Sequence, residues 1–184
     1  KGFEAPPAVG DFTGDGIPDY LVQGFEGTIT LVNGKDDRIL WEVKNPGFES
    51  ITIATPGFFV GNDQTPDVFA QISQGSFPAY TLNKQLLIDG ITGQVVWSAQ
   101  LGESAASGSI AVDLNGDGVD EVIFAINAPE SQGERLAKFY LFHPSGKELQ
   151  LLHTSRRFAI ASPWVGDMDG DGQLDLMLEG NTPE

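Results

Sequence analysis

The sequence predicts an all-β chain built from repeated units of four antiparallel strands, and three observations lead to this prediction. An acidic nine-residue motif with two glycines occurs three times. A second motif, an Asn/Asp-Gly turn followed by a Trp, recurs at similar spacing. Between the motifs, apolar residues alternate with polar ones or form short β-branched runs bounded by Gly, Pro, Asn or Asp, which is typical of strands. We expect a single structural region over residues 1–184.

The acidic motif reads D-x-[T/N/D]-G-D-G-x-x-[D/E] in residues 11–19, 113–121 and 167–175. Oxygen atoms at positions 1, 3 and 5 can converge on one hard cation, position 7 can offer its carbonyl, and position 9 adds a carboxylate. The glycines permit the tight turn. The motif therefore predicts three Ca²⁺ sites. Their expected ligands are Asp11, Thr13, Asp15, Ile17 and Asp19; Asp113, Asn115, Asp117, Val119 and Glu121; and Asp167, Asp169, Asp171, Gln173 and Asp175. Because ligand charge raises calcium affinity, the third set, with four carboxylates, is predicted to bind most tightly.

A damaged copy of the loop is expected between the first two intact ones. The second and third intact loops start roughly fifty residues apart, and the first and second about twice as far, so one repeat is missing from the first interval. Aligning Asp67 with Asp19 places Phe59, Gly61 and Asp63 at positions 1, 3 and 5. Two of the three side-chain ligands are then absent, and the loop around Asp63 and Asp67 is predicted to bind no metal.

The spacing excludes an EF-hand, the main alternative calcium motif. An EF-hand loop requires a bidentate Glu at position 12 and flanking helices. Position 12 is instead Val22, Phe124 or Leu178, in apolar runs that read as strands. The acid at position 9 suits a hairpin whose return strand begins at once.

The turn motif sets the size of the repeating unit. The motif, from the turn to the Trp, occupies residues 31–41 and 87–97, and a degenerate copy without the Trp occupies residues 141–150. A unit of roughly fifty residues with four antiparallel strands is typical of a β-propeller blade. The predicted units are 1–54, 55–105, 106–160 and an incomplete 161–184, about three and a half blades of a larger propeller. Trp41, Trp97 and Trp164 are expected to pack within the blades.

The loops resemble the calcium-binding hairpins of FG-GAP repeats, which occur in the integrin α-subunit propeller and in many secreted bacterial propellers. The turn over residues 89–97, Asp-Gly-x-Thr-Gly-x-x-x-Trp, resembles the strand-turn motif of propellers related to pyrroloquinoline-quinone enzymes. These resemblances imply a calcium-binding propeller that is secreted, extracellular or on the cell surface, with a role in adhesion. The chain departs from the family by lacking a literal Phe-Gly…Gly-Ala-Pro stretch.

Composition restricts the partners. The formal net charge of −16 argues against nucleic acid and against an anionic membrane surface. No apolar segment is long enough to predict membrane insertion. A chain without cysteine has no disulfides, and bound calcium can take over their role as a cross-link. We expect a protein or carbohydrate ligand, and either the rest of the propeller or another copy of the chain to cover the open sheet edges.

Two functional hypotheses follow. The favoured one is a calcium-stabilised extracellular β-propeller module with a structural, adhesive or protein-binding role. The alternative is the propeller portion of a secreted enzyme of the polysaccharide lyase or quinone-dependent dehydrogenase type. No nucleophile elbow, H-E-x-x-H motif or Walker loop is present in the sequence, so no catalytic residue is assigned and calcium is the one cofactor expected. A cluster of Arg, Lys, His and Tyr facing the propeller axis would favour the enzyme.

Overall fold

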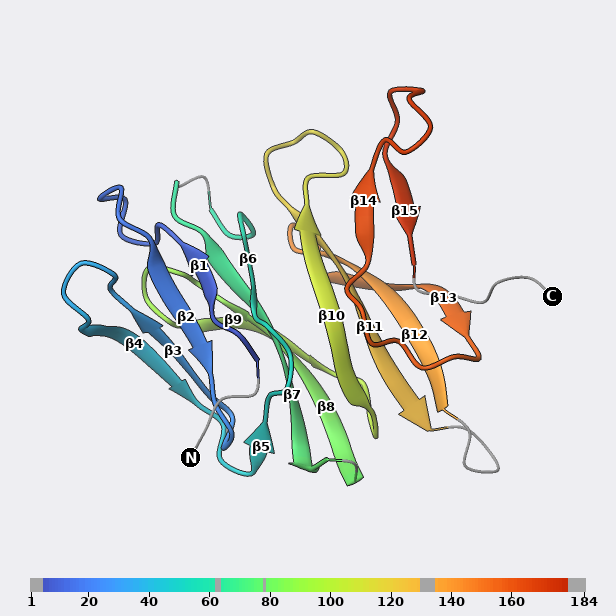
Figure 1. Cartoon of the computed structure of the whole chain (residues 1–184), viewed down its shortest axis with the longest axis horizontal. Helices are drawn as coiled ribbons and strands as arrows, with labels where there is room; N and C mark the ends of the chain where they lie inside the picture. The colour runs from blue at the N-terminus through green and yellow to red at the C-terminus, as the bar shows by residue number, and fades with distance from the viewer. Residues whose placement is uncertain (1–4, 62–63, 78, 130–134, 179–184) are drawn as a thin grey trace.

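The computed structural model describes residues 5–61, 64–77, 79–129 and 135–178. In this part of the chain every regular element is a β-strand, and consecutive strands pair antiparallel (Figure 1). They form three sheets in chain order and the first hairpin of a fourth. The fold is therefore all-β and consists of β-propeller blades, as the sequence predicts.

Each blade has its strands in sequence order. The first contains β1 (Ala8–Gly10), β2 (Asp19–Gln23), β3 (Thr28–Val32) and β4 (Ile39–Lys44). The second contains β6 (Thr55–Gly57), β7 (Asp67–Ser76), β8 (Ala79–Ile88) and β9 (Val95–Gln100), and a short β5 (Phe48–Glu49) also pairs with β7. The third contains β10 (Ala105–Val112), β11 (Glu121–Pro129), β12 (Arg135–His143) and β13 (Glu148–Ser155). The fourth begins with β14 (Trp164–Gly166) and β15 (Asp175–Met177).

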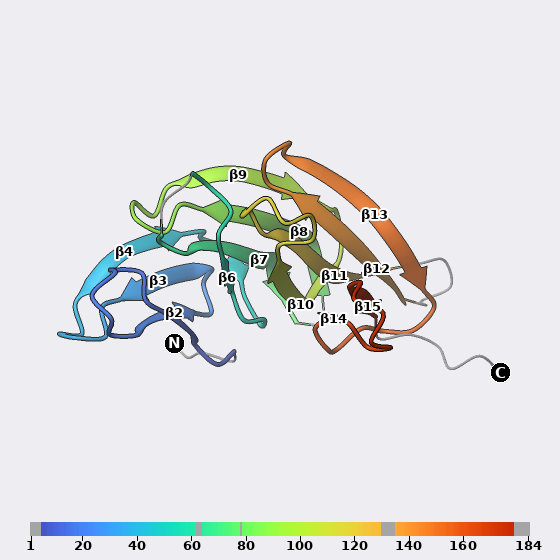
Figure 2. The same cartoon turned by 90° about the horizontal axis from the view of Figure 1, so that it is seen from above.

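The blades form a fan, with one strand of each on its concave side. β6, β10 and β14 lie on that side, while β4, β9 and β13 lie on the convex side (Figure 2). β6 contacts both β1 and β10, so the innermost strands of the three blades adjoin. A cavity of about 710 Å³ lies between them.

Burial along the strands depends on the position of the blade in the fan. In β2 and β3 of the first blade, buried residues alternate with half-buried ones, because one face of this sheet packs against a neighbour. In β7 and β11, the second strands of the middle blades, seven and eight consecutive residues are buried. These strands are covered on both faces, which explains why their sequences are apolar without alternation.

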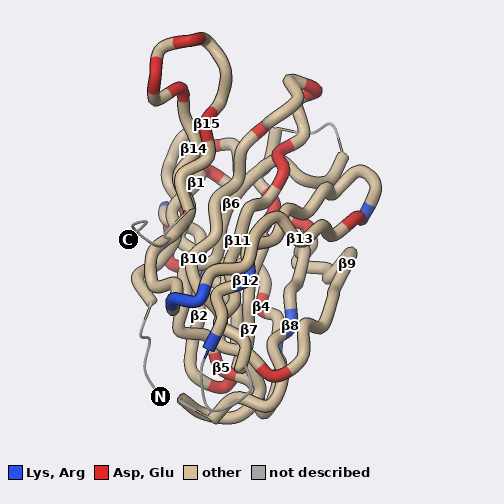
Figure 3. The backbone as a smooth tube through the Cα atoms, turned by 90° about the vertical axis from the view of Figure 1, so that its right-hand side faces the viewer, with Lys and Arg blue, Asp and Glu red and all other residues tan. Residues whose placement is uncertain are grey.

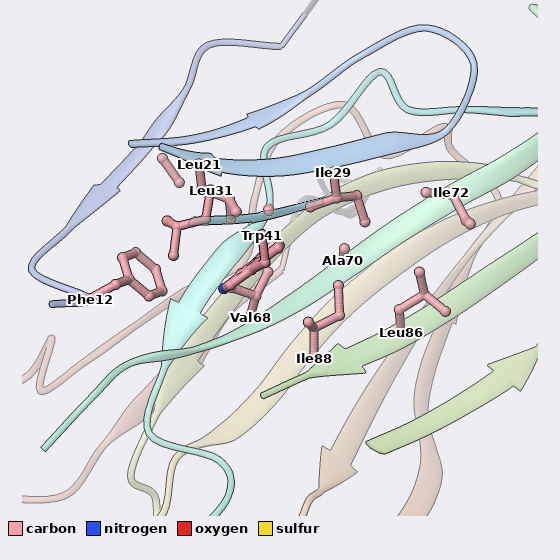
Figure 4. Close-up of a cluster of buried hydrophobic side chains, with 12 residues drawn as sticks. Phe12, Leu21, Ile29, Leu31, Trp41, Val68, Ala70, Ile72, Leu86 and Ile88 are labelled. Atoms are coloured by element: carbon pink, nitrogen blue, oxygen red, sulfur yellow. The ribbon is translucent and has the colours of Figure 1, made fainter. Parts of the chain in front are cut away.

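The hydrophobic core lies between blades. The cross-strand row Leu21, Leu31 and Trp41 of the first blade packs against Val68 and Ile88 of the second (Figure 4). Between the second and third blades, the rings of Phe69 and Phe124 lie 5.1 Å apart, and those of Trp97 and Phe142 stack at 4.0 Å. Burial of such large apolar side chains is the main favourable contribution to folding.

Trp41 and Trp97 thus pack between blades, whereas Trp164 does not meet the expectation of core packing. Its side chain is 44% exposed. Its indole lies against Gly166, where an added Cβ would be only 2.3 Å from the ring. The reason is that β14 belongs to a hairpin, whereas Trp41 and Trp97 lie on fourth strands, which face a complete neighbouring blade. No helix in the described ranges has the length and hydropathy needed to cross a membrane.

Candidate metal centre

All four loops between the first and second strands of the blades lie at the same end of the fan (Figure 1). Acidic residues mark loops at this end in the backbone view (Figure 3). In each hairpin the last strand pair joins the residue before the loop to the acid at position 9. These pairs are Gly10 with Asp19, Gly57 with Asp67, Val112 with Glu121, and Gly166 with Asp175.

The three intact loops share one backbone conformation. The glycines at positions 4 and 6 have positive φ in every copy, for example 77° at Gly116 and 86° at Gly118. This left-handed region suits glycine because other residues carry a Cβ that crowds the backbone. The two glycines of the repeated Gly-Asp-Gly element therefore give all three loops the same turn.

The carboxylate at position 1 organises each loop by accepting backbone hydrogen bonds. Asp113 accepts from Gly116 at 2.7 Å and from Gly118 at 2.9 Å, and Asp167 accepts from Gly170 and Gly172 at the same distances. Asp11 accepts from Gly16 at 2.9 Å. These N–H groups, that of Gly118 first, lower the pKa of Asp113 because they stabilise its charged form.

The carboxylate at position 5 accepts the N–H group of position 7 in each copy. The distance is 2.9 Å for Asp15 and Ile17, and 2.8 Å for both Asp117 and Asp171 with their partners. In the first loop, Asp15 also pairs with Lys35 at 3.5 Å. The N–H of Ile17, and then Lys35, lower the pKa of Asp15.

The fourth blade's loop brings three acids together. Carboxylate oxygens of Asp167, Asp169 and Asp175 lie within 4.8 Å of one another, an arrangement that can hold a cation. Asp171, also predicted as a ligand, is not in this group, and its oxygens accept hydrogen bonds from Gln173. In the first and third loops position 3 is Thr13 or Asn115, whose hydroxyl or amide oxygen is neutral.

Position 9 has a structural role that the motif alone did not reveal. Asp19 is fully buried, and one of its oxygens accepts the N–H groups of Phe12 and Thr13 at 2.8 and 3.0 Å. The other accepts the N–H of Gly34, at 2.9 Å, in the turn between β3 and β4. This carboxylate therefore ties the acidic loop to a second turn of the same blade.

The same arrangement persists in the second loop, which is predicted to bind no metal. Asp67 is buried and accepts from Phe59 and Val60 through one oxygen, and from Gly90 through the other at 2.9 Å. In this loop, as in the first, the position 9 acid therefore joins the loop to the turn between the third and fourth strands of its blade.

In the third blade a side chain takes the place of the turn N–H group in this contact. Pro144 occupies the place of Gly34 and Gly90 and has no N–H group to donate. The imidazole Nδ1 of His143 lies 3.5 Å from Glu121 instead, and Asn115 donates to the same carboxylate oxygen at 3.2 Å.

The strand register corrects the alignment of the second loop. Because Gly57 pairs with Asp67 as Gly10 pairs with Asp19, the second loop is one residue longer, and position 1 is Phe58 rather than Phe59. Phe59 instead corresponds to Phe12, and both are 4% exposed. Alignment on Pro-Asp was misleading because the insertion lies before this dipeptide. Asp63 falls outside the described residues, so the absence of metal here stays a prediction.

The close approach of the β8–β9 turn to the second loop can be tested by adding a side chain at Gly90. A Cβ at Gly90 would lie 1.8 Å from the carbonyl oxygen of Pro66, so Gly90→Ala must displace the turn from the loop. We expect urea unfolding to show a loss of about 2 kcal/mol. Gly146→Ala, in the third blade's corresponding turn, meets only the flexible Glu148 side chain at 3.3 Å and serves as the control. Equal effects of the two substitutions would contradict the close approach.

Comparison with known protein families gives a match to part of the chain. No curated protein matches it significantly. Residues 113–178 match the family model of the FG-GAP-like repeat. This stretch starts at position 1 of the third blade's loop and ends with the fourth hairpin, so it contains two of the three intact acidic loops. Residues 113–178 are therefore similar to FG-GAP-like repeats, in agreement with the family that the loop motif indicates.

Proposed function

We propose that this chain is a calcium-stabilised β-propeller module of an extracellular protein, with a structural, adhesive or protein-binding role. The observation that carries the proposal is the Asp167, Asp169 and Asp175 cluster in a loop whose backbone recurs in two other blades. Carboxylate oxygens are the ligands that calcium prefers. The similarity to FG-GAP-like repeats supports the extracellular, protein-binding setting.

Calcium would act here as a cross-link between strand ends. The acidic side chains at the end of each hairpin repel one another, and a divalent ion converts this repulsion into attraction. The carboxylate at position 9 accepts the N–H group of position 2 of its loop, and in the first blade it also accepts the N–H group of Gly34 in the β3–β4 turn. Ordering the loop therefore also stabilises this turn. The expected benefit is therefore a more stable blade.

Calcium titration tests this proposal. Isothermal titration of the chelator-treated chain should show three sites, and Asp11→Asn, Asp113→Asn and Asp167→Asn should each remove one. We expect the Asp167 loop to bind most tightly because it has four carboxylates. Calcium should also raise the melting temperature of the wild type.

Glu103→Gln is the matched control, since it removes one exposed charge outside the loops and should retain all three sites. A wild-type chain that binds no calcium at millimolar concentration would overturn the proposal. Equal affinities of the three loops would contradict only the ranking by charge.

The cavity between the innermost strands of the blades favours a binding module over the enzyme alternative. Its lining is supplied mainly by Ala, Ser, Gly, Thr, Ile, Val and Phe from the inner strands and their connections. Val9 and Ile160 are 61% and 77% exposed there. Such a surface suits apolar contact with other blades or with a partner, whereas acid–base chemistry needs titratable groups.

A further inference from the structure

A pair of hydrogen bonds joins the second and third acidic loops across the blade boundary. The backbone N–H of Asp120 donates to the carbonyl of Phe58 at 2.8 Å. In return, the N–H of Phe58 donates to the carboxylate of Asp120, also at 2.8 Å. Phe58 is position 1 of the second loop and Asp120 is position 8 of the third, so two loops 62 residues apart in sequence are tied together.

Phe58 departs from the repeated motif, and Asp120 is an acid at a position that carries none in the other loops. Position 8 is Pro18, Pro66 or Leu174 in the other loops, and none of these side chains can accept a hydrogen bond. Position 1 is Asp in the three intact loops, and an Asp at residue 58 would bring a second carboxylate close to that of Asp120, where like charges repel. The loss of an acid at position 1 and the gain of one at position 8 are thus explained by the same contact.

The contact is connected to the core of the third loop. Asp120 precedes Glu121, which is 2% exposed and accepts the N–H of Leu114 at 3.0 Å. A tether at residue 120 therefore restrains the position 9 carboxylate beside it. On the other side, Phe58 precedes Phe59, whose N–H is bonded to the buried Asp67.

We propose that the second loop is an inter-blade clasp, closed by Asp120, that holds the third loop in its cation-binding shape. Asp120 is a positioning residue in this arrangement and acts through Glu121. In the second loop, position 1 makes a contact with the next blade instead of offering a carboxylate. The clasp itself stands on the described contacts, whereas its effect on calcium rests on the proposed function.

The first experiment examines the clasp without calcium. Hydrogen exchange of the Phe58 amide is measured by NMR in chelator for the wild type, Asp120→Ala and Asp120→Asn. The alanine variant should lose protection at Phe58 by about tenfold or more, because the acceptor is gone. The asparagine variant retains an acceptor oxygen and should keep most of the protection. Unchanged exchange in Asp120→Ala would overturn the clasp.

The second experiment examines coupling to the ion. In an Asp11→Asn, Asp167→Asn background, the third loop is the intact motif that remains. Asp120→Ala should weaken calcium binding there about tenfold, whereas Asp120→Asn, which removes the same charge, should weaken it much less. Equal weakening would show that Asp120 acts through its charge and would overturn the positioning role.

The two failures are distinguishable. If the background variant binds no calcium, the proposed function fails at this loop, and the positioning role fails with it. The amide exchange still decides whether the clasp exists. If calcium binds and Asp120→Ala leaves its affinity unchanged, the coupling is overturned and the proposed function stands.

Discussion

Replacing Trp41 with alanine is expected to lower the free energy of unfolding by about 3–5 kcal/mol. The indole is 8% exposed and packs on Gly93 of the neighbouring blade, where an added Cβ would lie 2.7 Å from the ring. Its Nε1 donates to the carbonyl of Gly90 at 2.7 Å. Truncation therefore removes a large apolar contact and leaves a buried carbonyl without this donor.

Two further variants separate these contributions in urea unfolding followed by circular dichroism. Trp41→Phe keeps most of the ring contact but loses the hydrogen bond to the carbonyl of Gly90. We expect the loss of this hydrogen bond to lower the free energy of unfolding by about 1 kcal/mol. Trp164→Ala removes an indole that is 44% exposed and should cost less than about 1 kcal/mol. Comparable losses for Trp41→Ala and Trp164→Ala would show that Trp41 does not join the first two blades.

Asp67→Ala is expected to cost about 3 kcal/mol and to do so equally with and without calcium. The buried carboxylate accepts three backbone N–H groups, from Phe59, Val60 and Gly90. Its removal leaves three donors without their acceptor, those of Phe59 and Gly90 buried and that of Val60 partly buried. Asp67→Asn retains one acceptor oxygen but turns an amide donor toward another N–H, so it should recover only part of the loss.

The calcium independence is the informative outcome. Unfolding of Asp67→Ala and wild type is compared in calcium and in chelator, with Glu103→Gln as the control for charge. A destabilisation confined to the calcium-loaded protein would mean that this loop binds an ion. The prediction that the second loop binds no metal would then be wrong.

The pKa of Asp67 adds a test by pH. Burial raises this pKa, although the N–H groups of Gly90, Val60 and Phe59 act in the opposite direction. Because the folded-state pKa lies above the unfolded value, the stability linked to this proton is present below the unfolded pKa and is lost as pH rises through the folded pKa. The cost of Asp67→Ala should therefore be larger near pH 4 than at pH 7.

Much of the blade architecture could be predicted from residues close together in the chain. The glycines at positions 4 and 6 have the positive φ that the motif requires, and the strands on either side follow their apolar runs. That Trp41 and Trp97 are packing residues also followed from their equivalent positions in successive units, whereas their place between blades, rather than within them, did not. Local backbone preference and burial in a sheet depend on a few neighbouring residues, so they can be read from sequence.

The register of the second loop could not be predicted in this way. Its additional residue precedes Asp67, and the Pro-Asp dipeptide matches the first loop whether or not the insertion is counted. Only the pairing of Gly57 with Asp67 shows that Phe58 takes position 1. A one-residue shift changes which side chains face the core, and this is decided by strand pairing rather than by motif.

By itself, the sequence determined the all-β class, the blade repeat and the acidic loops, because each depends on interactions within one unit. Only the tertiary structure decided which atoms these units present to one another. The Trp41 bond to Gly90 and the Asp120 contact with Phe58 join residues 49 and 62 positions apart. Such hydrogen bonds form only after the blades pack, since burial of the apolar faces brings distant loops to the same end of the fan.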